Sequence, residues 1–437
     1  MQSRGLYVAI AVLIIVGGLW YWSQHRKPAQ ETSETSTETS PVILKLDENS
    51  IIRVQLTKKD SAPVVLERNS SGDWQIAAPK PLRSDQSAAS ALVGTLASLN
   101  SERVIEDRAS NVAEYGLVQP ALEVDVSEKD NRSQKLLIGD ETPSGSAVYA
   151  MLGGDPRVFT VASYTKSSLD KGVNDLRDKR LITLAPDKIT RVQLIKKGQE
   201  LEFGRNQDAW QILKPKPLRA DSTQVGDLVR ELTEAKMNVS APDADSSANY
   251  AKAAPVATAK ITGTTGTQQL EVRKLKDDYY AKSSIAEGAY KVDSSLGKGV
   301  EKNLVDFRNK ALFDFGFTTP TKIEIHTDAK AYFLTRGTGG EEDWWSNGKK
   351  MDGASAEEVI SKLRDLSATS FAESGFSRPE VELTVASNDG KRVENVSPSK
   401  QGDSYIAQRK GEPSLYKVSA NSVDDLLKAA AEVKAAK

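Results

Sequence analysis

Two segments of the chain repeat the same order of aromatic, proline and basic residues. WQIAAPKPLRSD spans residues 74–85 and WQILKPKPLRAD spans residues 210–221, with nine of twelve positions identical. The candidate contacts to a ligand or partner are Lys80, Arg83, Lys216 and Arg219. Cations beside a helix N-terminus can bind an anion. The structural alternative is that each arginine pairs with a carboxylate or covers the tryptophan ring, and the sequence leaves both interpretations open.

Few other residues have the chemistry that catalysis or metal binding needs. The absence of cysteine and the presence of only His25 and His326 exclude disulfides, thiolate catalysis and His-rich metal sites. No phosphate-binding loop and no nucleophile elbow occur. Asp140 and Glu141 are adjacent acids, but two acids without further ligands make a weak cation site, and a turn is the simpler interpretation. We therefore expect no enzyme, no cofactor and no metal; a hydrolase built from carboxylates distant in sequence is the least favoured alternative.

The charge balance gives no indication of a nucleic-acid partner. Lys and Arg number 59 and Asp and Glu number 60, so the net charge is −1. Nucleic-acid binding depends on a basic surface, which this composition does not provide. The length of 437 residues allows two to four domains.

The N-terminal segment has the pattern of a membrane anchor. Residues 5–22, GLYVAIAVLIIVGGLWYW, contain no charge and would span roughly 27 Å as a helix, close to the hydrocarbon thickness of a bilayer. The segment ends in an aromatic belt rather than in the small residues of a cleavage site. We expect residues 1–26 to be a single-pass anchor in the bacterial inner membrane, with a periplasmic body. Residues 27–41, rich in Ser, Thr and Glu, would form a flexible tether.

The rest of the chain repeats one pattern three times. IIRVQLTKK (51–59), ITRVQLIKK (189–197) and TKIEIHTD (321–328) alternate apolar and polar residues and predict half-buried strands. Each is followed by a second strand and then by a tryptophan in a third strand. These tryptophans are Trp74, Trp210 and Trp344 or Trp345. The predicted repeats cover residues 42–182, 183–313 and 314–437.

A helix is predicted behind each tryptophan strand. Segments 85–96, 221–232 and 352–363 carry apolar residues at i, i+3, i+4 and i+7, the spacing of one helix face. Each begins with an aspartate that can accept bonds from the free N–H groups of the first turn: Asp85, Asp221 and Asp352. Short strands joined by turns follow. The predicted fold class is α+β, with three tandem repeats of an antiparallel meander, an amphipathic helix and further short antiparallel strands, plus one N-terminal transmembrane helix.

These motifs resemble the domain of unknown function 4340 (DUF4340) family. The resemblance rests on the strand–turn–Trp segment around Trp74 and the helix behind Asp85. It rests further on AEYGL with QPAL (113–122), IGDETPSG with Tyr149, DPRVF (155–159) and LRDK (176–179). The second repeat lacks the Tyr-Gly-Leu and Gly-Asp-Glu-Thr-Pro elements. The resemblance implies a membrane-anchored extracytoplasmic protein found beside ABC-2-type transporter components of the gliding-motility kind, and it supplies no catalytic residues.

The function expected from these patterns is that of an interaction or scaffold protein. Its partners would be the membrane, through residues 5–22, and transporter subunits, which would make it an accessory subunit of an envelope transport complex. The alternative is a module that binds an envelope glycan or polymer through exposed aromatic residues and the cations of the PKPLR motif.

Overall fold

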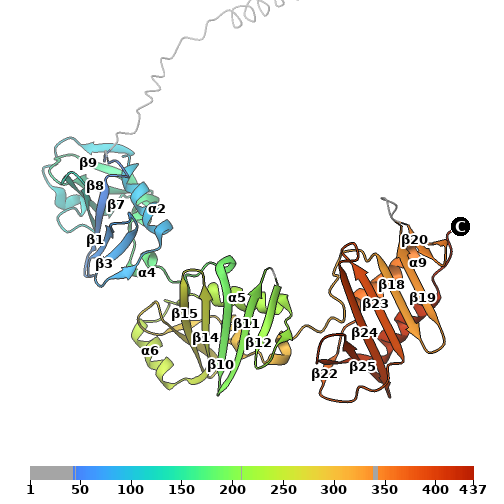
Figure 1. Ribbon diagram of the computed structural model, residues 1–437. Coiled ribbons are helices and arrows are strands. Elements are labelled where there is room, and N and C mark those ends of the chain that lie inside the picture. Colours follow the sequence, from blue (N-terminus) through green and yellow to red (C-terminus); the bar gives the residue numbers. More distant parts are fainter. Residues whose placement is uncertain (1–42, 45, 208, 338–342) are drawn as a thin grey trace, which may run out of the picture. The chain divides into compact units, whose positions relative to one another are not determined.

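The computed structural model describes residues 43–44, 46–207, 209–337 and 343–437. Within them, three antiparallel sheets follow one another along the chain, each accompanied by its own helices (Figure 1). The described residues separate into two compact units, one ending at Asp178 and the other running from Lys179 to Lys437. The first sheet belongs to the first unit, and the second and third sheets belong to the second unit.

The α+β fold class predicted from the sequence is wrong. Strands make up 42% and helices 23% of the structure, and the strands form antiparallel sheets of eight or nine strands. The strands expected to be short after each helix reach ten residues, as in β14, β15 and β24. Alternating apolar residues let neighbouring strands pair along their full length, so the sheet rather than the helices dominates each fold.

The predicted anchor at residues 5–22 and the predicted tether at residues 27–41 lie outside the described residues. In the part of the chain that the structure describes, no helix is both long and apolar enough to cross a membrane.

The first sheet has the strand order β4-β3-β2-β1-β6-β7-β8-β9-β5. Its strands are β1 (Ile51–Lys58), β2 (Val64–Arg68), β3 (Trp74–Ala78), β4 (Leu82–Arg83), β5 (Arg103–Glu106), β6 (Leu122–Glu128), β7 (Ser133–Glu141), β8 (Ala147–Leu152) and β9 (Val158–Ala162). Its helices are α2 (Gln86–Ala97), the 3-10 helix η1 (Val112–Tyr115), α3 (Ser163–Leu169) and α4 (Val173–Leu176). This sheet and its helices are called the first module.

The second sheet has the order β13-β12-β11-β10-β14-β15-β16-β17. Its strands are β10 (Ile189–Lys196), β11 (Gln199–Asn206), β12 (Ala209–Lys214), β13 (Leu218–Arg219), β14 (Ala254–Gly263), β15 (Gly266–Leu275), β16 (Asp278–Ser283) and β17 (Tyr290–Val292). The 3-10 helix η2 (Pro186–Lys188) precedes it, and its helices are α5 (Ser222–Thr233), α6 (Asp243–Lys252), α7 (Ser294–Glu301) and α8 (Leu304–Phe307). Together they form the second module.

The third sheet has the order β21-β20-β19-β18-β23-β24-β25-β26-β22. Its strands are β18 (Lys322–Thr327), β19 (Ala331–Arg336), β20 (Trp344–Ser346), β21 (Lys349–Met351), β22 (Ser370–Ala372), β23 (Val381–Ser387), β24 (Arg392–Gln401), β25 (Ser404–Arg409) and β26 (Leu415–Ser419). The helices of this third module are α9 (Gly353–Asp365) and α10 (Ala420–Ala431).

The core of each module lies between the sheet and the helix that follows the tryptophan strand. Trp74, Trp210 and Trp344 are 2%, 8% and 4% exposed, so the predicted third-strand tryptophan is confirmed as a core residue. The predicted apolar helix faces are also confirmed, because all four residues on each face of α2, α5 and α9 are buried. The three predicted N-cap aspartates each accept at least one main-chain N–H bond from the first turn.

One helix of the second module was not expected. The sequence ANYAKAAP (248–255) stands where the first repeat has AEYGLVQP, in the region predicted to hold short strands joined by turns, but it forms the end of helix α6 and the start of β14. Tyr250 of α6 is 8% exposed, and the guanidinium of Arg273 lies 4.4 Å from the centre of its ring. The loss of the Tyr-Gly-Leu element in this module therefore coincides with a local change of structure.

Candidate functional site

The PKPLR motif forms one edge of the sheet in the first and second modules. After Trp74 in β3, the proline-containing turn leads to the two-residue strand β4, where Arg83 pairs with Gln75. In the second module Arg219 of β13 pairs with Gln211 in the same way. The sequence predicted an extended crossing here, but it missed that the crossing folds back onto the tryptophan strand.

The two lysines and the two arginines of the motif have different surroundings. Lys80 and Lys216 are exposed on the turns. The guanidinium of Arg83 lies 3.4 Å from the carboxylate of Asp178, whose side chain is 8% exposed. The main-chain N–H of Asp178 also donates to the carbonyl of Arg83 at 2.9 Å. The structural interpretation of the motif therefore applies to Arg83.

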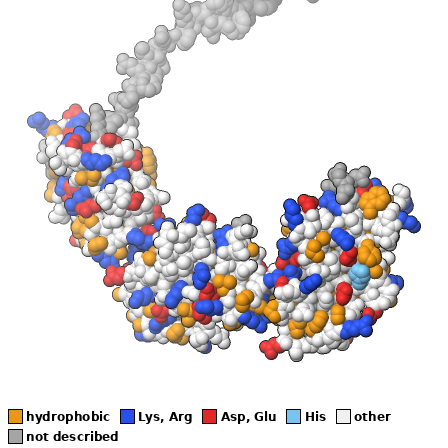
Figure 2. Space-filling view, in the orientation of Figure 1, with side chains coloured by type: hydrophobic (Ala, Val, Ile, Leu, Met, Phe, Trp, Pro, Cys, Tyr) orange, Lys and Arg blue, Asp and Glu red, His pale blue; other side chains and the backbone are white. Residues whose placement is uncertain are grey.

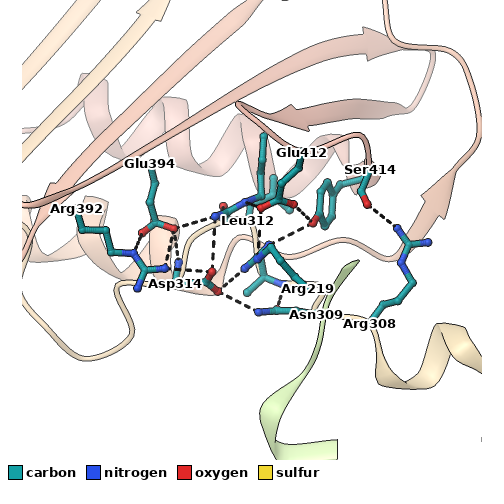
Figure 3. Close-up of polar contacts among 12 residues, drawn as sticks. Arg219, Arg308, Asn309, Leu312, Asp314, Arg392, Glu394, Glu412 and Ser414 are labelled. Atoms are coloured by element: carbon teal, nitrogen blue, oxygen red, sulfur yellow. Dashed lines mark hydrogen bonds and ion pairs between the residues drawn. The ribbon is translucent and has the colours of Figure 1, made fainter. Parts of the chain in front are cut away.

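Arg219 belongs to a cluster of charged residues within the second compact unit (Figure 3). Its side chain is 17% exposed. The guanidinium donates to the main-chain oxygen of Ala311 at 2.8 Å, to the hydroxyl of Tyr416 at 3.2 Å and to the carboxylate of Asp314. The carboxylate of Glu412 lies 3.6 Å from Arg219 Nε. Four acceptors thus surround one planar cation, a geometry for which arginine is better suited than lysine.

Two further arginines complete this cluster. Arg409 lies 3.1 Å from a carboxylate oxygen of Glu394 and 2.8 Å from one of Glu412. Arg392 lies 3.2 Å from Asp314 and 3.3 Å from Glu394. We call these three arginines, three carboxylates and Tyr416 the arginine cluster. Its formal charges balance, which reduces the cost of burying them.

Two groups of the arginine cluster, Arg219 and Tyr416, have pKa values shifted from their ordinary ones. Burial lowers the pKa of Arg219, but the charges of Asp314 and Glu412 and the hydrogen-bonded hydroxyl of Tyr416 outweigh it and hold the pKa above its ordinary value. Burial is the main cause that raises the pKa of Tyr416, so its hydroxyl stays protonated and donates to Glu412 at 2.8 Å. The contacts of the arginine cluster are thus ion pairs and hydrogen bonds within the chain, an arrangement that holds structure together.

Sequence reasoning named Arg219 but missed its partners, which lie up to 197 residues further along the chain. Phe159, Tyr290 and Tyr416 pair with equivalent alanines of the preceding strand in the first, second and third modules, so the residue type at this position does not single out Tyr416. Lys350 stands at the β21 position that Arg219 occupies in β13.

A family model matches the chain over residues 74–255 and again over residues 210–383. The two matches together run from residue 74 to residue 383, which is more than half of the chain. The chain belongs to the DUF4340 family, a domain of unknown function. The comparisons with curated proteins and with solved structures found no match.

The two DUF4340 matches begin at Trp74 and Trp210, the equivalent tryptophans of the first and second modules. Each match continues past its own module into the first strands of the next sheet, ending in β14 and in β23. The family pattern therefore includes the segment that leaves one module and enters the next, and the second match contains Arg219 and Asp314 of the arginine cluster but ends before its other residues.

The AEYGL and IGDET elements of the DUF4340 resemblance contact each other in the first module. Tyr115 donates to the carboxylate of Glu106 at 2.7 Å, and its ring centre lies 4.8 Å from that of Tyr149. The hydrogen bond to Glu106, helped by burial, raises the pKa of Tyr115 to about 12. Gly116 has φ +68°, and a Cβ there would lie 2.5 Å from Cγ of Asp140. Gly116 is thus required by both its conformation and its contact.

The weak cation site considered at Asp140 and Glu141 gains no further ligand. Asp140 and Glu141 are the last two residues of strand β7, so the turn predicted for them is wrong, and Asp140 packs against Gly116. Within the described residues, no group of three or more His, Cys, Asp or Glu side chains is placed to hold a metal ion.

Proposed function

We propose that this DUF4340 protein is an interaction or scaffold protein rather than a catalyst. The observation that supports this most is the use of one sheet-and-helix module three times, with the arginines of its most distinctive motif bound to carboxylates of the chain itself. The face of each sheet opposite the helices carries polar side chains, such as Gln55, Gln193 and Glu324, that alternate with buried ones. Figure 2 shows cations and anions interspersed over the visible surface, with no field of one sign. Such a surface suits protein partners better than nucleic acid.

We further propose that the three modules are three tandem copies of the family domain. The third module repeats the central strand order of the first two, and its helix α9 begins at an aspartate cap in the same place. Duplication also accounts for two family matches that start 136 residues apart, at equivalent tryptophans.

The proposed location is the bacterial inner membrane, with residues 5–22 as a single-pass anchor, residues 27–41 as a tether and the modules in the periplasm. The apolar sequence of the anchor and the family resemblance support this. In this setting the chain would be an accessory subunit of an envelope transport complex of the ABC-2, gliding-motility-like type.

Two experiments test this role. Affinity purification of the full chain from detergent-solubilised membranes should recover transporter subunits, and repeated recovery of none would overturn the accessory role. Because the natural chain has no cysteine, Lys216→Cys provides a single reporter on an exposed turn. A maleimide reagent that crosses the outer membrane but not the inner membrane should label this variant in intact cells. Labelling only after lysis would overturn the proposed topology.

The glycan-binding alternative is weaker in the form that used the PKPLR cations. Arg83 and Arg219 contact Asp178 and Asp314 within their own units, so a polymer would have to compete with these carboxylates. Cosedimentation with cell-wall polysaccharide tests this alternative. Strong binding that Arg83→Ala and Arg219→Ala together abolish would restore it.

A further inference from the structure

The third module contains an apolar cavity of about 160 Å³ near the edge of its sheet. Its lining includes Ile323, Ile325, Leu334, Met351, Val359 and Val433, from the sheet, from helix α9 and from the chain after helix α10. A cavity of roughly 150 Å³ with aliphatic walls is large enough to bind a benzene ring.

The first two modules fill the corresponding place with their own side chains. Two residues after the tryptophan, the first module has Ile76, which pairs with Leu82, and the second has Ile212, which pairs with Leu218. At this position the third module has Ser346, which pairs with Lys349. Two apolar residues at the sheet edge are thus replaced by polar ones. These pairs are strictly equivalent, because each begins two positions after Trp74, Trp210 or Trp344.

A third apolar residue is replaced at the position that accepts a hydrogen bond from the helix-capping aspartate. The N–H of each of these aspartates donates at 2.8 Å to a main-chain oxygen, which belongs to the last residue of α4 or α8 in the first two modules and to the chain after α10 in the third. The acceptor residue is Leu176 in the first module, Phe307 in the second and Lys434 in the third. Leu176 and Phe307 are fully buried, whereas Lys434 is exposed.

The position of Phe307 in the second module shows which side chain is missing from the third module. Its ring lies 4.8 Å from that of Phe203, which pairs with Val192 in the second sheet. The equivalent pair in the third sheet is Leu334 with Ile323, and both of these residues line the cavity. The cavity therefore lies where the second module packs a phenylalanine ring.

We propose that this cavity binds a leucine or phenylalanine side chain of a partner protein, presented beside a carboxylate. The aromatic or branched side chain would take the place that Leu176 and Phe307 take in their own modules. Lys349 and Lys434 are both exposed. Lys349 pairs with Ser346 across the strands, and Lys434 follows Val433 in the chain, so both lie next to residues that line the cavity. Their charges favour a partner segment with an acidic residue beside the inserted side chain. The chain's own filled sites have this sequence, with Asp175 before Leu176 and Asp306 before Phe307.

The proposal rests on the interaction role proposed above and adds the place and the chemistry of the partner. A fluorescein-labelled peptide of residues 303–307, NLVDF, in which Asp306 is the only charged side chain, serves as the probe, with the full chain in detergent and fluorescence anisotropy as the readout. The wild-type chain should bind this peptide at least tenfold more tightly than a peptide in which serine replaces the phenylalanine. Equal binding of both peptides, or no binding of either, would overturn the proposal.

A filled variant provides the second arm. Ser346→Ile with Lys434→Phe restores the residues of the other modules and should raise the thermal midpoint while weakening peptide binding at least tenfold. Lys349→Glu should weaken binding without closing the cavity, whereas Lys252→Glu on exposed α6 should leave it unchanged. Unchanged binding by the filled variant would overturn the proposal. Binding of decanoate in place of the peptide would also overturn it, since the occupant would then be an acyl chain. Self-association of the wild-type chain that the filled variant loses would overturn it as well, since the occupant would then be a second copy of the chain. Co-purification of transporter subunits remains an independent readout of the scaffold role.

Discussion

The guanidinium of Arg219 donates a hydrogen bond to the hydroxyl of Tyr416, 197 residues away in sequence, at 3.2 Å. The same guanidinium binds Asp314 and the main-chain oxygen of Ala311. These contacts tie the short edge strand β13 to the segment that precedes the third sheet and to β26, the last strand of that sheet in the sequence. An arginine that sequence analysis offered as a ligand contact is thereby explained as an internal tie.

Replacing Arg219 with alanine should destabilise the second compact unit by about 2–3 kcal/mol. Fully buried ion pairs cost about 3–5 kcal/mol to break, and the value here is lower because Asp314 and Glu412 are about a quarter exposed. Denaturant unfolding measures the change. Arg230→Ala is the matched control, since Arg230 and Asp227 are 56% and 39% exposed and such pairs contribute about 0–1 kcal/mol. Equal losses in the two variants would show that the arginine cluster is not the tie described here.

The capping aspartates make a second prediction. Asp85→Ala should lower the free energy of unfolding by about 1 kcal/mol, because the Asp85 carboxylate accepts the N–H groups of Ser87 and Ala88. Asp85→Asn should cost much less, since its amide oxygen can accept the same bonds. The comparison can be made by thermal unfolding followed by circular dichroism. Identical losses for the two replacements would indicate that charge, rather than hydrogen bonding, is what the helix requires.

Gly116 and Gly145 form a pair that separates conformation from contact. Both have positive φ, +68° and +71°, but only at Gly116 would a Cβ meet another residue, at 2.5 Å from Cγ of Asp140. Gly145→Ala should cost about 1–2 kcal/mol, the strain of a left-handed conformation. Gly116→Ala should cost more, because the Asp140 side chain must also move. Equal unfolding free energies for the two variants would show that the close contact between Gly116 and Asp140 does not constrain position 116.

The lowered pKa of Glu202 predicts that the free energy of unfolding depends on pH. Burial raises its pKa, but hydrogen bonds from Gln193 and Lys214 and the charges of Arg191 and Lys214 outweigh this and leave the pKa below its ordinary value. A carboxylate with a lowered pKa adds stability above its unfolded pKa of about 4.3, and that stability is lost as the pH falls through the folded pKa.

The stability difference between the wild type and Glu202→Gln should therefore be largest near neutral pH and should shrink below about pH 4. Unfolding by urea at a series of pH values measures it. Glu234→Gln is the control, because the Glu234 side chain is 67% exposed and lies 3.8 Å from its arginine partner. A difference that stays constant with pH would contradict the assignment of the lowered pKa.

The sequence by itself determined the repeated local elements. The alternation in IIRVQLTKK places β1 at Ile51–Lys58, and the spacing behind Asp85 places α2 at Gln86–Ala97. These features depend on residues close together in the chain, so periodicity and capping chemistry are sufficient to find them. The same reasoning located the buried tryptophans, since Trp in a half-buried strand packs on the helix behind it.

Only the tertiary structure decided what the PKPLR arginines do and how extensive the sheets are. Arg219 meets Asp314 and Tyr416 because β13 lies against residues that follow about 95 and 197 positions later, a distance that no local pattern reports. The cavity of the third module has the same origin. In the sequence, Ser346, Lys349 and Lys434 look like ordinary surface residues. Only the strand pairing shows that they replace apolar residues that fill the core of the other two modules. Side-chain packing depends on residues that are distant in the sequence, so the contacts of Arg219 and the cavity of the third module can be recognised only in the folded structure.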